Sequence, residues 1–294
     1  MIPAPQRSLR IRSAVTVVAV AAVLLVGCDE ATRDPASDPS PRVTSPPERS
    51  DGGLPPRATI AAPTLDPEPP LAGLVVVLDP GHQLGNAAFP AEVAAPVDAG
   101  GFTKPCNTTG TATNGGYPEA SFTWAVAGAT RRLLRRLGAR VSLTRTSNSA
   151  TAWGPCIDER GRAGNPGEPG PTADLKVSIH ADGSLAPGAH GFHVIAPAEI
   201  APWTTDIAVP SLELAEAMRD VLVEEGFAPS TYAGSDGIDV RGDLGTLNLA
   251  DVPTVMVELG NMRDPGDAML MTSAAGRRHY ASALARSIAR FLAR

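Results

Sequence analysis

The sequence has little of what several common classes of protein depend on. Aromatic residues make up only 4% of the 294 residues, and the formal net charge is −6. An acidic chain with few aromatic side chains is poorly suited to nucleic acid, because phosphates repel it and few rings can stack on bases. The sequence also contains no internal repeat and no H-E-x-x-H motif, which argues against repeat architectures and that zinc-protease signature.

An apolar stretch near the N-terminus is too short for an ordinary membrane span. It has the order of a secretory signal that ends in a bacterial lipobox: Arg7, Arg10 and Arg12, then residues 14–26, then Leu25-Val26-Gly27-Cys28. We expect residues 1–28 to be a lipoprotein signal peptide, cleaved before Cys28, whose sulfur then carries a lipid. The protein would be exported and anchored at the outer face of the cytoplasmic membrane or in the cell envelope. Without the lipid it would be secreted, and the remaining alternative for the stretch is a buried core helix.

Composition divides the rest of the chain into two parts. Residues 29–70 are rich in Pro, Ser, Asp and Thr and have few large apolar side chains, so burial cannot offset the entropy cost of ordering them. We expect a disordered tether there. Residues 71–294 then form one domain, of a size that suits a single sheet with its covering helices.

Cysteine is scarce, with three residues in the whole chain. Once Cys28 is assigned to the lipid, only Cys106 and Cys156 remain, and they do not form a C-x-x-C pair. In an exported domain this pattern favours a disulfide between the two over a metal site. Two independent buried thiols are the alternative.

Apolar runs and helical periodicities alternate along the domain. The run at 73–78 is nearly continuous in apolar residues, as in a strand that is buried on both faces of a parallel sheet. Further strands are expected at 141–145, 174–179, 191–196 and 254–257, and helices at 118–137, 156–164, 211–225 (burying Leu212, Ala215, Met218 and Leu222) and 274–293. This alternation predicts an α/β fold, a single domain with a mostly parallel twisted sheet covered by helices on both faces.

Three residues with catalytic or metal-binding chemistry follow predicted strands: His82, His180 and Glu258. The carboxyl ends of strands in open α/β sheets are where ligands bind. Glu119 lies in the first turn of a predicted helix, where the helix dipole favours the ionised form that a metal ligand needs. His82, Glu119 and His180 make up a donor set that catalytic zinc uses, which leaves Glu258 as a base.

Each of these residues also has an ordinary structural explanation. His82 could cap a turn, Glu119 could be a common helix-start carboxylate, and His180 could form hydrogen bonds at a strand end. Glu258 is the hardest to explain in this way, because a carboxylate after an apolar strand should be partly buried.

At these positions the sequence resembles a known family. Residues 78–82 (LDPGH), 178–182 (SIHAD) and 257–261 (VELGN) resemble the three signature blocks of the zinc-dependent N-acetylmuramoyl-L-alanine amidases of the Amidase_3 type. Glu119 falls where that family has its second metal ligand, and two further motifs match its T-R strand end and its R-x-x-x-A-N helix: Thr144-Arg145, and Arg160 with Gly164-Asn165. The resemblance covers roughly residues 74–293 and is greatest to the mycobacterial and actinobacterial members.

The resemblance implies that His82, Glu119 and His180 hold Zn²⁺ and that Glu258 is the catalytic glutamate. The implied reaction is hydrolysis of the amide bond between N-acetylmuramic acid and L-alanine, with peptidoglycan or muropeptides as partners. Separately, we expect the protein to act as a monomer. Two alternatives remain: a catalytically silent peptidoglycan-binding or regulatory protein on the same fold, and a zinc peptidase that acts within the stem peptide.

The sequence departs from the family in having a long 83–118 segment beside the first histidine. We interpret this insertion as a lid or as a wall of the substrate groove, which the two cysteines would hold in place. No cell-wall-binding repeat is present, so the lipid and tether would position the protein on the wall. Arg241, Asn248 and Asn261 are expected to contact the substrate. Four arginines form a basic helical face that is expected to be solvated, with contact to an anionic wall polymer as the alternative: Arg131, Arg132, Arg135 and Arg136.

Overall fold

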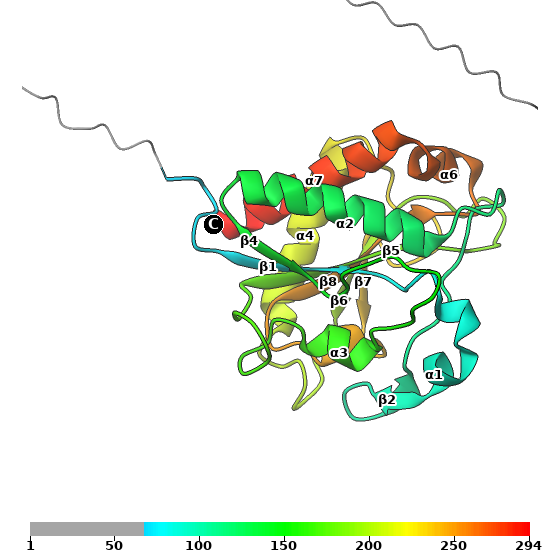
Figure 1. Ribbon diagram of the computed structural model, residues 1–294. Coiled ribbons are helices and arrows are strands. Elements are labelled where there is room, and N and C mark those ends of the chain that lie inside the picture. Colours follow the sequence, from blue (N-terminus) through cyan, green and yellow to red (C-terminus); the bar gives the residue numbers. More distant parts are fainter. Residues whose placement is uncertain (1–67) are drawn as a thin grey trace, which may run out of the picture. The chain divides into compact units, whose positions relative to one another are not determined.

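The computed structural model describes residues 68–294 (Figure 1). The predicted signal peptide, the lipidation site at Cys28 and nearly all of the predicted tether lie outside these residues. Within the part described, no helix has the length and apolar character needed to cross a membrane.

A six-stranded sheet forms the centre of the described region, in the order β4-β1-β5-β8-β6-β7. Its strands are β1 (Val75–Pro80), β4 (Arg140–Leu143), β5 (Leu175–Asp182), β6 (His193–Pro197), β7 (Ile238–Arg241) and β8 (Thr254–Asn261). All neighbouring strands are parallel except β6 and β8, which are antiparallel. The predicted α/β class with a mostly parallel sheet is therefore confirmed.

Helices cover both faces of this sheet (Figure 1). Three long helices pack together on one face: α2 (Glu119–Arg136), α4 (Ala208–Glu224) and α7 (Ala274–Leu292). The short helices α3 (Ile157–Arg162) and α5 (Gly245–Asn248) contact each other on the opposite face. A further helix, α6 (Pro265–Thr272), packs beside α7.

The apolar run of β1 contributes to two hydrophobic clusters, one on each face of the sheet. Side chains alternate along a strand, so Val76 and Leu78 join the core under α2 and α7, whereas Val75 and Val77 join a smaller cluster on the other face. All four are buried. This explains why the run reads as continuously apolar rather than alternating.

The buried face of α4 differs from the predicted stripe at one position. Ala215, Met218 and Leu222 are buried as expected, but Leu212 is 37% exposed. Ser211 and Leu214 take its place in the interior. The prediction for Leu212 was wrong because the buried face is centred on the series 211, 214–215, 218 and 221–222, and residue 212 lies about 100° from residue 211 around the helix.

Two strands are longer than the sequence suggests. β5 continues to Asp182 and β8 continues to Asn261, so His180 and Glu258 lie within strands rather than just after them. The short strand β7 was not predicted, because its four residues are not buried and carry no apolar run.

The 83–118 insertion forms a small lobe of its own beside the main sheet (Figure 1). It contains a single 3-10 turn at Asn86–Ala88, helix α1 (Pro90–Ala94) and an antiparallel pair of strands, β2 (Pro96–Asp98) and β3 (Thr103–Pro105). A disulfide joins Cys106, just after β3, to Cys156 at the start of α3. The predicted pairing of these cysteines is present, and it fixes the lobe to the main domain.

Candidate active site

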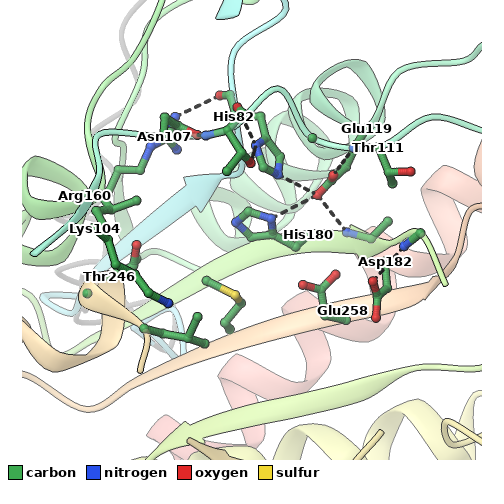
Figure 2. A pocket seen from close by; sticks show the side chains of 18 of the residues that line it. His82, Lys104, Asn107, Thr111, Glu119, Arg160, His180, Asp182, Thr246 and Glu258 are labelled. Carbon is green, nitrogen blue, oxygen red and sulfur yellow. Dashed lines mark hydrogen bonds and ion pairs between the residues drawn. The ribbon is translucent and has the colours of Figure 1, made fainter. Parts of the chain in front are cut away.

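Three side chains meet at the carboxyl end of the sheet (Figure 2): His82 from the loop after β1, Glu119 from the start of α2 and His180 from β5. One oxygen of Glu119, Oε1, lies 3.1 Å from His82 Nε2 and 3.0 Å from His180 Nδ1. One donor atom from each residue lies within 4.8 Å of the others. Tetrahedral zinc with bonds of 2.0–2.2 Å holds its donors roughly 3.4 Å apart. The donor set fits the ion in chemistry, and both distances from Glu119 to the imidazoles are near this spacing, while the widest donor separation, up to 4.8 Å, exceeds it.

His82 is held in one orientation from both its ring and its backbone. Its Nδ1 faces the carbonyl oxygen of Thr108 at 3.1 Å, which leaves Nε2 directed at Glu119. An outer hydrogen bond of this kind fixes the tautomer of a metal-binding histidine. The backbone of His82 has φ of 57°, a left-handed conformation that a non-glycine residue adopts at some energetic cost and that is common at functional sites.

Glu119 opens α2 and is almost completely buried. The backbone N–H of Thr111 donates to Oε2 at 2.9 Å, and that of Ala181 donates to Oε1 at 3.2 Å. Burial by itself would raise the pKa of Glu119, but His82 and His180 outweigh it and hold the pKa well below its usual range. Glu119 is therefore an anion poised between two imidazoles, as a ligand carboxylate must be.

A buried ion pair behind the site positions the chain around His82. Asp79 Oδ1 accepts a hydrogen bond from Arg160 Nη1 at 2.5 Å, and Asp79 Oδ2 accepts one from Ser178 at 2.6 Å. Arg160 also donates to the carbonyl oxygen of His82 at 2.8 Å. Burial alone would raise the pKa of Asp79, but Arg160 and the hydroxyl donors bring it far below its usual range.

The T-R motif recognised in the sequence contacts the end of β1, next to His82. Thr144 donates to Asp79 at 2.5 Å, and Arg145 donates to the carbonyl oxygens of Pro80 at 3.0 Å and Ala120 at 2.9 Å. These bonds tie the end of β1 to the start of α2, the two segments that carry His82 and Glu119. The motif thus has a positioning role that its sequence alone did not reveal.

Glu258 lies beside this cluster on β8 (Figure 2). It is directly opposite His180 in the β5–β8 pair. Its Oε2 atom is buried and has no hydrogen-bond partner among the described residues. Burial, reinforced by the negative charges of Glu119 and Asp182, raises the pKa of Glu258 well above its usual range. A carboxyl group with a raised pKa binds a proton more readily than an ordinary glutamate does.

The cluster opens into a cavity of about 570 Å³. The main domain contributes His82, Glu119, His180 and Glu258, together with Asp182 and residues 244–246. The insertion contributes another part of the wall, between Lys104 and Thr111. The insertion therefore forms a wall of this cavity; that the cavity is the substrate groove, and that the insertion moves as a lid, stay predictions.

Several polar residues in the cavity wall, among them Lys104 and Thr246, were missed by sequence reasoning. Lys104 lies in the short strand β3, and its Nζ donates to Asp243 at 3.1 Å; Thr246 lies in α5. Neither follows a strong periodic element, and no motif marks them. The only available signal was that Lys104 belongs to the long insertion beside His82.

The three residues expected to contact substrate do not line this cavity. Arg241 pairs with Asp243 at 2.9 Å. The buried Asn248 donates to the carbonyl oxygens of Ala99 and Gly242, and the buried Asn261 donates to those of Ser184 and Ala189. The expectation is corrected for both asparagines, because their amide donors are used to hold neighbouring loops.

Comparisons with known proteins agree with this geometry. A family described as N-acetylmuramoyl-L-alanine amidase, Amidase_3, matches residues 76–290. An N-acetylmuramoyl-L-alanine amidase of Mycobacterium tuberculosis is 46% identical over 224 residues, which are 76% of this chain and 88% of the relative. A crystal structure of an N-acetylmuramyl-L-alanine amidase from Mycobacterium smegmatis is 43% identical, with a TM-score of 0.68 over 76% of this chain and 98% of that one. The apo form of the corresponding enzyme from Mycobacterium abscessus is 44% identical, with a TM-score of 0.68 over 75% of this chain and 99% of that one. This chain belongs to the Amidase_3 family of N-acetylmuramoyl-L-alanine amidases.

Proposed function

We propose that this protein is a zinc-dependent hydrolase that cleaves the amide bond between N-acetylmuramic acid and L-alanine in peptidoglycan. Membership of the amidase family supports the reaction. The observation that carries the zinc assignment is the single oxygen of Glu119 within 3.1 Å of ring nitrogens of both His82 and His180. Glu258 lies in the same cavity and would transfer the proton that the reaction requires.

His82 through Nε2, His180 through Nδ1 and Glu119 through its carboxylate would hold the ion. Two imidazoles and one carboxylate leave a further coordination position for water or substrate, as in catalytic zinc sites. When bound, zinc supplies Lewis acidity that polarises the scissile carbonyl and makes water a better nucleophile. The Thr108 contact of His82 and the backbone donors to Glu119 keep both side chains aimed at the site.

Glu258 acts as general base and then as general acid. It takes the proton of the attacking water and delivers it to the amide nitrogen of L-alanine, which is a poor leaving group until it is protonated. Its raised pKa favours the step in which it takes up the proton, because the protonated form is stabilised by burial. Its unpartnered Oε2 leaves a lone pair free for that proton.

The cavity wall binds and orients the substrate. A volume of about 570 Å³ lies within the usual range for small-ligand pockets, roughly 300–1,000 Å³, and admits a fragment of the stem peptide next to the lactyl group. Lys104 is the cation on the wall contributed by the insertion, and we assign it to a carboxylate of the stem peptide.

The cellular context is part of the same proposal. Export by the signal at residues 1–28, a lipid on Cys28, the tether at 29–70 and action as a monomer would place a single catalytic domain near its polymeric substrate. Phase partition of the cell-expressed protein and of a Cys28→Ser variant tests the anchor. The unmodified protein should enter the detergent phase and the variant should not.

Mass spectrometry of digested muropeptides tests the reaction itself. Intact muropeptide should yield a free stem peptide and a glycan that retains its lactyl group. A sugar-free stem peptide of the same sequence should remain uncut, because it lacks the scissile bond. Cleavage of that peptide would show a peptidase, and binding of muropeptide without any cleavage by the zinc-loaded protein would show a silent member of the family.

A further inference from the structure

A second hollow of about 510 Å³ lies on the outer side of α2. Its lining includes Trp124, Gly128, Arg131, Arg132, Arg135 and, from β4, Leu143, and we call it the α2 arginine groove. It shares no lining residue with the catalytic cavity. The groove is therefore a separate feature of the molecule that the proposed reaction does not use.

Among the described residues, the arginines of this groove lack the carboxylate partners that Arg219, Arg286 and Arg290 have, although Arg135 donates to the carbonyl oxygen of Val141 at 3.1 Å. Arg286 and Arg290 on α7 pair with Glu224 at 2.6 and 2.7 Å, and Arg219 pairs with Asp236 at 2.5 Å. Across residues 68–294, in contrast, the three groove arginines form no ion pair, nor do the neighbouring Arg136 and Arg140. The whole chain carries a net charge of −6, so this local excess of positive charge is not a consequence of composition.

The three groove arginines are grouped closely enough to act on one ligand. Arg131 and Arg135 are four positions apart on α2, and Arg132 and Arg135 are three apart, so their side chains lie on adjacent turns of one helix face. The Nε of Arg131 is buried and has no hydrogen-bond partner among the described residues. Guanidinium groups bind phosphate oxygens through paired hydrogen bonds, which makes a phosphate diester a better match than a lone carboxylate.

Trp124 gives the groove an apolar plane beside these charges. Arg145 covers one face of the indole, 4.9 Å from the ring centroid, and the half-exposed ring lines the groove. Gly128, one turn further along α2, has no side chain to fill the space between Trp124 and Arg132. An aromatic plane next to guanidinium groups suits a ligand in which a sugar or polyol is joined to phosphate.

We propose that the α2 arginine groove binds a phosphodiester-linked polyol or sugar polymer of the cell envelope, and that it holds the catalytic domain on the wall independently of catalysis. A membrane surface fits less well, because the apolar face of α2, which includes Phe122, Val126 and Leu134, is buried against the sheet and cannot enter lipid. Nucleic acid also fits less well, because the groove has one indole rather than a series of rings for successive bases.

Binding of fluorescently labelled poly(glycerol phosphate) to the full-length protein tests this proposal. The variant Arg132→Gln/Arg135→Gln removes two groove charges, and Arg286→Gln/Arg290→Gln removes two paired charges on α7 as the matched control. We expect the groove variant to bind about tenfold more weakly at low salt, with a salt dependence shallower by roughly 1.5 in log–log slope. The control should bind within about twofold of wild type, because its arginines are already neutralised by glutamates.

The proposal would be overturned if both double variants lost the same amount of affinity for poly(glycerol phosphate), or if the groove variant bound it as tightly as wild type. Turnover of a soluble muropeptide should be unchanged in both, which verifies that they are folded. If the groove double variant melts early, the single change Arg132→Gln at an exposed position serves instead, with about a threefold loss expected.

Three further probes distinguish the source of the negative charge. Polyglutamate of equal charge, phosphatidylglycerol vesicles and single-stranded DNA are each titrated against wild type and the groove variant. The proposal is supported if each of the three binds more weakly than poly(glycerol phosphate), or binds wild type and the groove variant equally well. Groove-dependent binding of any one of them that is as tight as that of poly(glycerol phosphate) would overturn it, in favour of simple charge attraction, a membrane contact or nucleic-acid binding.

Discussion

His180 and Glu258 lie directly opposite each other in the parallel pair of β5 and β8. Paired residues on neighbouring strands point to the same face of a sheet, so one imidazole of the proposed zinc site and the proposed base share one rigid surface. Glu119 reaches the same place from the first turn of α2, 3.0 Å from the ring of His180. The roles of the two carboxylates can therefore be tested separately.

Replacing Glu258 should stop the reaction without removing the metal. Glu258→Gln keeps the shape of the side chain but cannot accept the water proton, so turnover should fall by about 10²-fold or more. Zinc content, measured by mass spectrometry of the metal, should match that of wild type because the ligand set is intact. Glu213→Gln, at an exposed position on α4, is the control and should have full activity. Substantial turnover by the Glu258 variant would exclude its role as the base.

Removing the metal, or its central ligand, should lower both activity and stability. A chelator should abolish turnover by wild type and reduce its melting temperature, since an ion at 1,000 times its Kd stabilises the folded state by about 4 kcal/mol. Added zinc should restore both. Glu119→Gln should melt at a temperature that zinc does not change. A chelated, metal-free preparation with full activity would rule out the zinc mechanism.

Asp79 should make the stability of the domain sensitive to strong acid. Its pKa in the folded state lies below the value of 3.8 expected for the unfolded chain, so it contributes stability that is fully present above about pH 4 and is lost as the pH falls further. Asp79→Asn should cost about 3–5 kcal/mol at neutral pH, because Arg160 would remain buried without its partner. Urea unfolding between pH 2 and about pH 7 checks both statements. Parallel stability curves for wild type and variant would contradict this assignment.

The disulfide should stabilise the domain and the cavity wall together. It closes a loop with a sequence separation of 50, which in the chain-entropy model is worth about 4 kcal/mol. Cys106→Ala/Cys156→Ala should therefore unfold at lower denaturant concentration. Its KM for muropeptide should rise more than its kcat falls, because the wall from Lys104 to Thr111 loses its attachment to α3. Unchanged melting and unchanged kinetics would show that the bridge has neither effect.

Lys104 should affect substrate affinity rather than the chemical step. Lys104→Met keeps most of the side-chain volume but removes the charge, so KM should rise by roughly two- to fivefold for stem peptides with free carboxylates, as expected for a partly exposed ion pair. Lys104→Arg is the matched control and should have a KM near that of wild type. Muropeptides with amidated stem carboxylates should show no difference among the three proteins. An equal effect on amidated and free substrates would argue against a charge contact.

The candidate metal ligands could be recognised in the sequence because each follows a local sequence signal. His82 and His180 follow apolar strand runs, and Glu119 follows the proline that precedes α2. Parallel strands present their carboxyl ends at one edge of a sheet, so residues at those ends approach each other whatever the loops between them do. The structure brings these three side chains together as that rule requires.

The substrate-facing residues were not recognisable in the same way. Asn248 and Asn261 have side chains that suit substrate contacts, but backbone carbonyl groups from distant loops occupy their amide donors. Whether a polar side chain faces a cavity or a carbonyl group depends on which loop packs against it, and no local pattern records that.

Taken by itself, the sequence determined the alternation of strands and helices, the pairing of its two remaining cysteines and the residue types at the strand ends, because apolar periodicity and strand termination are local properties. Only the tertiary structure decided that Lys104 of the insertion faces the cavity, that Asp79 and Arg160 form the buried pair behind His82, and that Leu212 is left at the surface. Those outcomes arise from packing between segments far apart in the chain, and packing is decided by all contacting surfaces at once.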